Sequence, residues 1–232
     1  MNKDVIIACD FPGAAQTYAF LDLFTEEKPF VKIGMELFYS AGPEIVREIK
    51  RRGHKIFLDL KLHDIPNTVG RSMAVLSGLD VDICNLHAAG GSEMMRAAVK
   101  GLTREEGSRP LLIAVTMLTS IDEERMNGEL GIRGSLPDTV MKYALCARDS
   151  GLDGVVCSPL EAQAVHETCG ESFLTVTPGI RFSGGAEGDQ KRVTTPARAR
   201  EIGSDYIVVG RPITAAADPV EAYRRCVREF LG

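Results

Sequence analysis

The sequence predicts an α/β protein, a single-domain (β/α)8 TIM barrel that spans residues 1–232. Short apolar runs rich in β-branched residues recur eight times, which leaves about 29 of the 232 residues for each repeat, enough for a strand, a helix and two short loops. Segments with helical periodicity separate these runs, and apolar strands that alternate with amphipathic helices are typical of a parallel sheet covered by helices. A closed barrel typically needs about 250 residues, and no change in composition indicates a second domain.

Each expected element follows from its own stretch. In chain order, the strands are predicted from the runs VIIAC at 5–9, FVKI at 30–33, KIFLDL at 55–60, VDICNL at 81–86, LLIAVTM at 111–117, GVVC at 154–157, FLTV at 173–176 and YIVV at 206–209. Helical spacing of apolar residues predicts helices at 14–24, 44–51, 69–76, 93–102, 139–147, 160–168, 195–202 and 219–230. An open doubly wound sheet fits less well, because residues 10–13 (DFPG) after the first strand are not a glycine fingerprint.

Charge and composition exclude several classes of function. A formal charge of −5, with no basic run, argues against nucleic acid as the main partner. The six cysteines form no CxxC motif and several lie in apolar runs, so we expect buried free thiols. The apolar run at the N-terminus is too short for a signal peptide, and no stretch reaches transmembrane length. We therefore expect a cytoplasmic protein that does not bind membranes.

The stretch 57–68 (FLDLKLHDIPNT) carries the first chemical signal. Side chains alternate across a strand, so Asp59 and Lys61 share one face, and Asp64 follows three residues later. If Pro66 is the first helical residue, the cap position falls on Ile65 and Asp64 is not a standard N-cap. A solvated edge strand would explain the same charges, and the stretch by itself leaves both interpretations open.

Polar residues gather where the other expected strands end, which is the face that carries the active site in such barrels. They are Asp10, Lys32, Asn85, His87, Thr116, Thr119, Ser120, Arg181 and Arg211, and Pro178 and Gly210 lie in the same segments as the two arginines. An unpaired lysine inside the apolar run 30–33 would be costly to desolvate, so we expect Lys32 to pair with Asp10 and Asp59 on neighbouring strands. Asn85 and His87 are equally explained as structural polar residues, and the hydroxyls at 116, 119 and 120 as turn caps. His54, His63 and His166 lack metal-ligand spacing, so we expect them to be structural or exposed.

The last two strands predict a phosphate site. Barrels commonly bind phosphate with the loops that follow strands 7 and 8. Arg181 and Gln190 bracket a glycine-rich stretch after strand 7, and Gly210 precedes Arg211, whose guanidinium can hold a phosphate with two hydrogen bonds. Neither a Ser–His or Cys–His pair nor metal-ligand spacing accompanies this clamp. The chemistry that these residues can still support is proton transfer and electrostatic stabilisation, acting on a phosphorylated substrate.

Together these residues resemble the orotidine 5′-monophosphate decarboxylase family in its bacterial form. The matching segments are the D-x-K-x-x-D run at 59–64 with IPNT at 65–68, Asp10 in ACD, Lys32 in VKIG, VTMLTS at 115–120, TPGIR at 177–181, Gln190, and VGRP at 209–212. One D-x-K-x-x-D run is a weak signal. Seven segments in order, between about residue 4 and residue 220, are a specific one.

The resemblance implies a homodimeric (β/α)8 barrel that converts orotidine 5′-monophosphate to UMP and CO2, the last step of de novo pyrimidine synthesis, without metal or organic cofactor. It assigns Lys61, flanked by Asp59, as the proton donor to C6 of the pyrimidine. Carried over in the same way, Lys32 bonds Asp59 and the ribose, Asp10 binds a ribose hydroxyl, Asp64 reaches the partner's site with Thr68 beside it, Thr119 and Ser120 face the base, Arg181, Gln190, Gly210 and Arg211 hold the phosphate, and Pro178 contacts the substrate.

Two alternatives stand beside this expectation. Sister enzymes of the ketogulonate-phosphate decarboxylase or hexulose-phosphate synthase type share the D-x-K-x-x-D run but use Mg²⁺, with an acidic metal ligand on strand 2. This chain has Lys32 there, which repels a cation. The other alternative is a sensor that binds a pyrimidine nucleotide without catalysis. An intact Asp/Lys array argues against it, because a binding protein does not need a buried proton donor.

Overall fold

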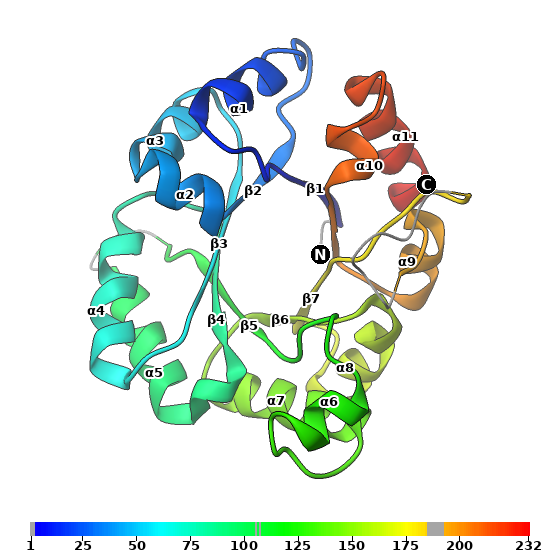
Figure 1. Ribbon diagram of the computed structural model, residues 1–232. Helices are drawn as coiled ribbons and strands as arrows, with labels where there is room; N and C mark the ends of the chain where they lie inside the picture. Colours follow the sequence, from blue (N-terminus) through cyan, green and yellow to red (C-terminus); the bar gives the residue numbers. More distant parts are fainter. Residues whose placement is uncertain (1–2, 105, 107, 185–192) are drawn as a thin grey trace.

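The computed structural model describes residues 3–104, 106, 108–184 and 193–232, and over these residues eight parallel strands close into a barrel in chain order. Helices surround the strands on the outside (Figure 1). The strands are β1 Asp4–Ala8, β2 Phe30–Gly34, β3 Ile56–Leu62, β4 Ile83–His87, β5 Leu111–Val115, β6 Gly154–Val156, β7 Leu174–Thr177 and β8 Tyr206–Val209. Each lies within one or two residues of its predicted run, and the predicted fold class is confirmed.

The helices follow the expected order, with three short additions. They are α1 Ala14–Leu21, α2 Met35–Ala41, α3 Glu44–Arg51, α4 Pro66–Ser77, α5 Gly91–Leu102, α6 Glu123–Gly128, α7 Leu136–Asp149, α8 Ala162–Cys169, α9 Pro196–Ile202, α10 Arg211–Thr214 and α11 Pro219–Leu231, with 3₁₀ turns at Ala88–Gly90 and Pro159–Glu161. Helices α2, α6 and α10 were not predicted. Each is seven residues or shorter and shows little periodicity.

Local chemistry explains where the helices begin. Asp122, Ser135, Thr195 and Asp218 are N-caps whose side chains accept a hydrogen bond from the backbone N–H three residues later. Proline occupies the first turn of α4, α7, α9 and α11, where its fixed φ suits a helix and its missing N–H needs no partner. Helix α4 begins at Pro66 with Ile65 as its N-cap, as the sequence predicts.

The barrel interior changes character along its axis. Its apolar layer contains Ile6, Ala8, Phe30, Phe57, Ile83, Ile113, Val176 and Val208. Two residues beyond Phe30, Phe57 and Ile83, on the same face of each strand, stand Lys32, Asp59 and Asn85. Three neighbouring strands therefore turn from apolar to polar at their C-terminal ends. The outward-facing residues join the larger core between the barrel and the helices.

Strand β3 contains a β-bulge that was not predicted from the sequence. Leu58 pairs with Cys84 and Leu62 with Leu86, so β3 advances four residues while β4 advances two. Within this bulge Lys61 has φ of 50°, in the left-handed region that side chains disfavour. The backbone therefore adopts an unusual conformation at Lys61, the residue that we expect to be the proton donor.

The predictions about the cysteines and His54 are confirmed. The six cysteines are free thiols, five of them buried, and burial raises the pKa values of Cys9, Cys84 and Cys226 to about 12. His54 is buried with Nδ1 at 2.9 Å from the Pro29 carbonyl oxygen, and burial lowers its pKa. Within the described part of the chain, every helix is too short or too polar to cross a bilayer.

Candidate active site

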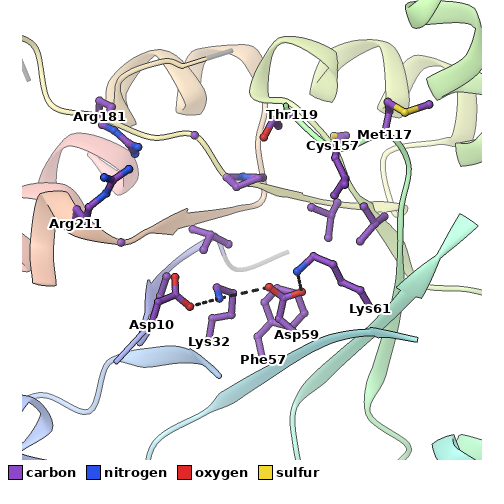
Figure 2. Close-up of a pocket in the computed structure, with 18 residues that line it drawn as sticks. Asp10, Lys32, Phe57, Asp59, Lys61, Met117, Thr119, Cys157, Arg181 and Arg211 are labelled. Carbon is purple, nitrogen blue, oxygen red and sulfur yellow. Dashed lines mark hydrogen bonds and ion pairs between the residues drawn. The ribbon is translucent and has the colours of Figure 1, made fainter. Parts of the chain in front are cut away.

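A cavity of about 470 Å³ opens at the C-terminal ends of the strands. Asp10, Lys32, Asp59 and Lys61 lie along one side of it, and Arg181 and Arg211 lie at another (Figure 2). Thr119, Met117 and Cys157 lie across the cavity from the Asp/Lys row (Figure 2). The barrel thus brings residues from seven of its eight strand ends, all except β4, into one site.

Lys32 is held between two carboxylates. Its Nζ lies 2.8 Å from Asp10 Oδ1 and 3.4 Å from Asp59 Oδ2, and the residue is 9% exposed. Burial alone would lower the pKa of Lys32, but Asp59 and Asp10 outweigh it and the pKa is raised. The pairing expected for a lysine inside an apolar strand is confirmed.

Asp59 carries the contacts on to Lys61. Lys61 Nζ donates to Asp59 Oδ1 at 2.6 Å. Burial would raise the pKa of Asp59, but Lys32 and Lys61 outweigh it and the pKa is lowered. The result is a row of alternating charges, Asp10–Lys32–Asp59–Lys61, in which each interior group contacts opposite charge on both sides (Figure 2).

Two uncharged residues support this row. A Cβ on Gly34, at the end of β2, would lie 3.1 Å from both Asp10 Oδ1 and Lys32 Nζ, so the glycine leaves room for the ion pair. Asn85 on β4 donates from Nδ2 to Asp59 Oδ1 at 2.7 Å, and its Oδ1 accepts from the Lys61 backbone N–H at 2.8 Å. The sequence left Asn85 open between a structural and a site role, and it gave Gly34 no role.

Arginines 181 and 211 mark the cavity's other end. Gly179, with φ of 83°, turns the chain after β7, and Gly210 joins β8 to the short helix α10. Arg181 N donates to Thr194 O at 2.9 Å, which ties the chain beyond the glycine-rich stretch back to β7. Gln190 lies outside the described residues. Arg181, Arg211, Gly210 and Pro178 all line the cavity.

The remaining wall is mostly apolar. Val115, Met117, Leu118, Val156 and Cys157 line it, and Thr119 adds a hydroxyl. Thr116 does not line the cavity, because its hydroxyl donates to the Val156 carbonyl at 3.0 Å. Ser120 is exposed and also lies outside the lining.

Comparisons with known proteins agree with this geometry. The family described as "Orotidine 5′-phosphate decarboxylase / HUMPS family" matches residues 3–226. The chain belongs to this family. Proteins named orotidine 5′-phosphate decarboxylase from Bacillus cereus (strain G9842) and Bacillus cytotoxicus are each 55% identical over 235 residues, covering 100% of this chain and 99% of the relative.

Two solved structures are also similar. Orotidine 5′-phosphate decarboxylase from Lactobacillus acidophilus has a TM-score of 0.89 and 43% identity, covering 100% of both chains. A protein of Geobacillus kaustophilus, described as an uncharacterized conserved protein, has a TM-score of 0.88 and 48% identity, covering 97% of this chain and 99% of its own. Both likenesses cover nearly all of this chain and therefore concern the barrel as a whole.

Asp64 and Thr68, to which the decarboxylase resemblance assigns a role in a partner's site, do not line this chain's own cavity. Both are exposed, and Asp64 Oδ1 accepts from the Ile65 backbone N–H at 2.6 Å. Exposed apolar side chains in this part of the chain include Ile65, the N-cap of α4, which is 65% exposed, and Val75 of α4, which is 70% exposed. These residues belong to the outer surface of the single chain.

The site's donor set does not favour a metal ion. Over the residues that the structure describes, no three His, Cys, Asp or Glu side chains gather as a metal site would require. The carboxylates of Asp10 and Asp59 are instead engaged by Lys32 and Lys61. A cation placed among them would face two ammonium groups.

Proposed function

We propose that this chain decarboxylates orotidine 5′-monophosphate to UMP and CO2, as the enzyme that completes de novo pyrimidine synthesis in the cytoplasm. The observation that carries the proposal is the Lys61 ammonium, held 2.6 Å from Asp59 in a cavity whose other end holds two arginines. A cationic proton donor and an anion-binding end in one cavity suit a phosphorylated substrate that must develop negative charge on carbon. The acidic chain, with net charge −5, is not suited to nucleic acid.

Lys61 addresses the main barrier of this reaction. Loss of CO2 leaves a carbanion at C6 that the pyrimidine ring cannot easily delocalise, so the barrier is largely electrostatic. Two unit charges about 4 Å apart interact by about 4 kcal/mol at an effective dielectric of about 20, which corresponds to roughly a thousandfold in rate. Lys61 stabilises the developing charge in this way and then donates a proton to C6.

The other members of the row orient the substrate. Asp59 fixes Lys61 and would lie beside the substrate carboxylate, which disfavours the bound acid but not the departing neutral CO2. Lys32 and Asp10 sit at the end of the row where ribose hydroxyls would bind. In this proposal Thr119 faces the base from the opposite wall, Pro178 of the lining also contacts the substrate, and Ser120 contributes from just outside the lining.

The phosphate binds at the arginine end. Arg181 and Arg211 offer guanidinium groups that suit a phosphate, and Gly210 allows the backbone to approach it. Gln190 completes this clamp in our proposal. Binding energy from the phosphate, which takes no part in the bond cleavage, would hold the pyrimidine against Lys61.

We further propose that the enzyme is a homodimer in which Asp64 and Thr68 complete the partner's site. The support is their exposure, their distance from their own cavity lining, and the exposed apolar side chains of Ile65, Val75 and Tyr39. Apolar side chains exposed in this way are typical of surfaces that a partner covers.

The direct test mixes the protein with orotidine 5′-monophosphate and follows the loss of its ultraviolet absorbance. The wild-type protein should form UMP, and Lys61→Ala should lower kcat by at least about 1,000-fold, because it removes both the stabilising charge and the proton donor. Circular dichroism should show an intact fold. Substantial turnover by the variant would remove Lys61 from its assigned role, and an inactive wild-type protein would refute the proposed reaction.

A second test separates this reaction from the Mg²⁺-dependent sugar-phosphate chemistry of the sister enzymes. Activity should be unchanged after dialysis against EDTA, because Lys32 occupies the strand position where those enzymes carry an acidic metal ligand. Added Mg²⁺ should not increase the rate. Activity that disappears with EDTA and returns with Mg²⁺ would favour the sister reaction.

A further inference from the structure

Asn85 is a buried amide that contacts the Asp/Lys row without lining the cavity. It lies on β4, is 1% exposed, and its carboxamide makes two hydrogen bonds. Nδ2 donates to Asp59 Oδ1 at 2.7 Å, and Oδ1 accepts from the Lys61 backbone N–H at 2.8 Å. Neither group that it contacts belongs to its own strand.

The direction of the amide follows from its partners. A backbone N–H can only donate, so the atom facing Lys61 N must be the oxygen. The nitrogen then faces Asp59, whose Oδ1 also accepts from Lys61 Nζ. One side chain therefore constrains both the carboxylate and the backbone of the residue that carries the ammonium.

Asn85 contacts β3 where the regular backbone pairing with β4 is interrupted. The regular pairing between β3 and β4 is interrupted between Leu58 and Leu62, and Lys61 has φ of 50° inside this bulge. Asn85 Oδ1 takes the role of a ladder acceptor for the Lys61 N–H. Without this hydrogen bond the bulge can relax, and its relaxation would change the direction in which the Lys61 side chain leaves the strand.

We propose that Asn85 is a positioning residue for the decarboxylation, which holds Asp59 and the Lys61 bulge in the geometry that aims the ammonium at the reacting carbon. The inference rests on the proposed function, since it assigns Asn85 a role in that reaction. Asn85 itself does not touch the substrate; its effect passes through the two residues that it bonds.

Removal of the amide should lower kcat and leave substrate binding largely intact. Asn85→Ala should reduce kcat by about 100-fold, the cost of misplacing a reacting group by about 1 Å. KM for orotidine 5′-monophosphate and the affinity for UMP should change less than about threefold, because Arg181, Arg211 and Asp10 are untouched.

Asn85→Asp gives a signature that a purely structural residue would not. The introduced carboxyl has the same shape and can accept from the Lys61 N–H, but when ionised it cannot donate to Asp59 and repels it. Two carboxyl groups in contact share a proton, so the protonated form returns as the pH falls. The variant should therefore lose at least about 100-fold in kcat at pH 8 and recover at least about tenfold of it at pH 5.5.

The wild-type row should hold its charges across this pH range. The pKa of Asp59 is lowered from 3.8 and that of Lys32 is raised from 10.5. Nearby imidazoles are those of His87, two residues from Asn85, and His63, whose ring centroid lies 5.6 Å from that of His87. Burial, then His63 and Lys61, lower the pKa of His87 from 6.5. The wild-type profile, measured in parallel, contains the contribution of His87, so the recovery is read as the ratio of variant to wild type.

Thr116→Val is the matched control. Thr116 is also buried, at the end of the next strand, and its hydroxyl donates to the Val156 carbonyl rather than to the Asp/Lys row. It should lose stability but keep kcat within about threefold. Kinetics are scored on protein shown to be folded by thermal melting, and Asn85→Asp decides alone if Asn85→Ala does not fold.

The proposal is overturned if the folded Asn85 variants keep kcat within threefold of wild type, if their losses lie in KM alone, or if the Asn85→Asp ratio does not change with pH. These outcomes are distinct from a failure of the proposed function. If the proposed function is wrong, the wild-type protein itself would not decarboxylate orotidine 5′-monophosphate.

Discussion

Gly34 shows, at the scale of single residues, how a missing methyl group sustains the charged row. A Cβ there would lie 3.1 Å from Asp10 Oδ1 and from Lys32 Nζ, two atoms that are themselves 2.8 Å apart. Lys32 Nζ cannot retreat freely, because Lys32 is buried and also contacts Asp59. The glycine is therefore required by space and not by its backbone angles, since its φ is −87°.

Gly34→Ala should lower kcat/KM by about tenfold, because a shift of a few tenths of an ångström in Lys32 disturbs the contact that orients Asp59. Gly128→Ala is the control, since a Cβ there meets nothing within 4 Å. Steady-state kinetics and thermal melting would measure both variants. Equal activity of Gly34→Ala and the control would show that the ion pair tolerates the displacement.

The site residues that could be predicted from the sequence are charged, and those that could not are uncharged. Asp10, Lys32, Asp59 and Lys61 are charges at the ends of apolar strands, where an unpaired charge is costly, so their pairing could be inferred. Asn85 is uncharged and suits a structural role equally well, and a glycine carries no chemical signal. Their contributions depend on distances of about 3 Å between strands, which no pattern within one strand contains.

At the scale of elements, helices α4 and α5 are in backbone contact. A Cβ on Gly101 would lie 2.1 Å from Gly70 O, and a Cβ on Gly70 would lie 3.1 Å from Ala97 O. The two glycines thus let the helices approach more closely than side chains would allow. Helix α4 begins two residues after Asp64 and contains Thr68, so this contact also sets the position of the surface that we assign to the dimer.

Gly101→Ala should destabilise the fold by about 2 kcal/mol, because the new methyl group collides with backbone that cannot rotate away. For a chain of this size, that corresponds to a decrease in Tm of roughly 6 °C. Gly78→Ala, at the end of α4, is the control, since its Cβ would meet Val75 O at an ordinary 3.4 Å. A melting temperature for Gly101→Ala equal to that of the control would show that the helices separate without cost.

Helices and strands could be predicted where a pattern of apolar residues is long enough to recognise, and could not be predicted where the element is short or irregular. The eight strands follow from apolar runs, and the long helices from periodicity over two turns or more. Helices α2, α6 and α10 are too short for a period to be seen. The bulge in β3 changes the pairing with β4 and leaves the alternation of Asp59 and Lys61 intact, so the run of residues carries no trace of it.

At the scale of the whole molecule, the barrel divides its interior into an apolar layer and a charged layer. Phe30, Phe57 and Ile83 form part of the apolar layer, and Lys32 and Asp59 follow two residues later on the same strands. The apolar layer excludes water from beneath the charges, which strengthens their interactions. The outer surface carries Asp64 and Thr68, which do not line their own cavity. In the proposed dimer they would complete the cavity of the second chain.

A shared site predicts that two inactive variants restore each other. Lys61→Ala and Asp64→Ala homodimers should each have much reduced activity. In a mixed dimer, the chain with Lys61 receives Asp64 from the Lys61→Ala chain, so one site is complete and the other lacks both residues. A random mixture of chains should therefore recover about a quarter of wild-type activity, because half of its dimers are mixed and each has one complete site.

The experiment requires mixed dimers to be isolated, which co-expression with two different affinity tags allows. Purified mixed dimers should then show about half of the wild-type activity per dimer. If Asp64 acted within its own chain, both sites of the mixed dimer would lack one residue and no activity would return. A monomer at assay concentrations, seen by analytical ultracentrifugation with full activity, would contradict the shared site directly, because Asp64 and Thr68 would then have no cavity to complete.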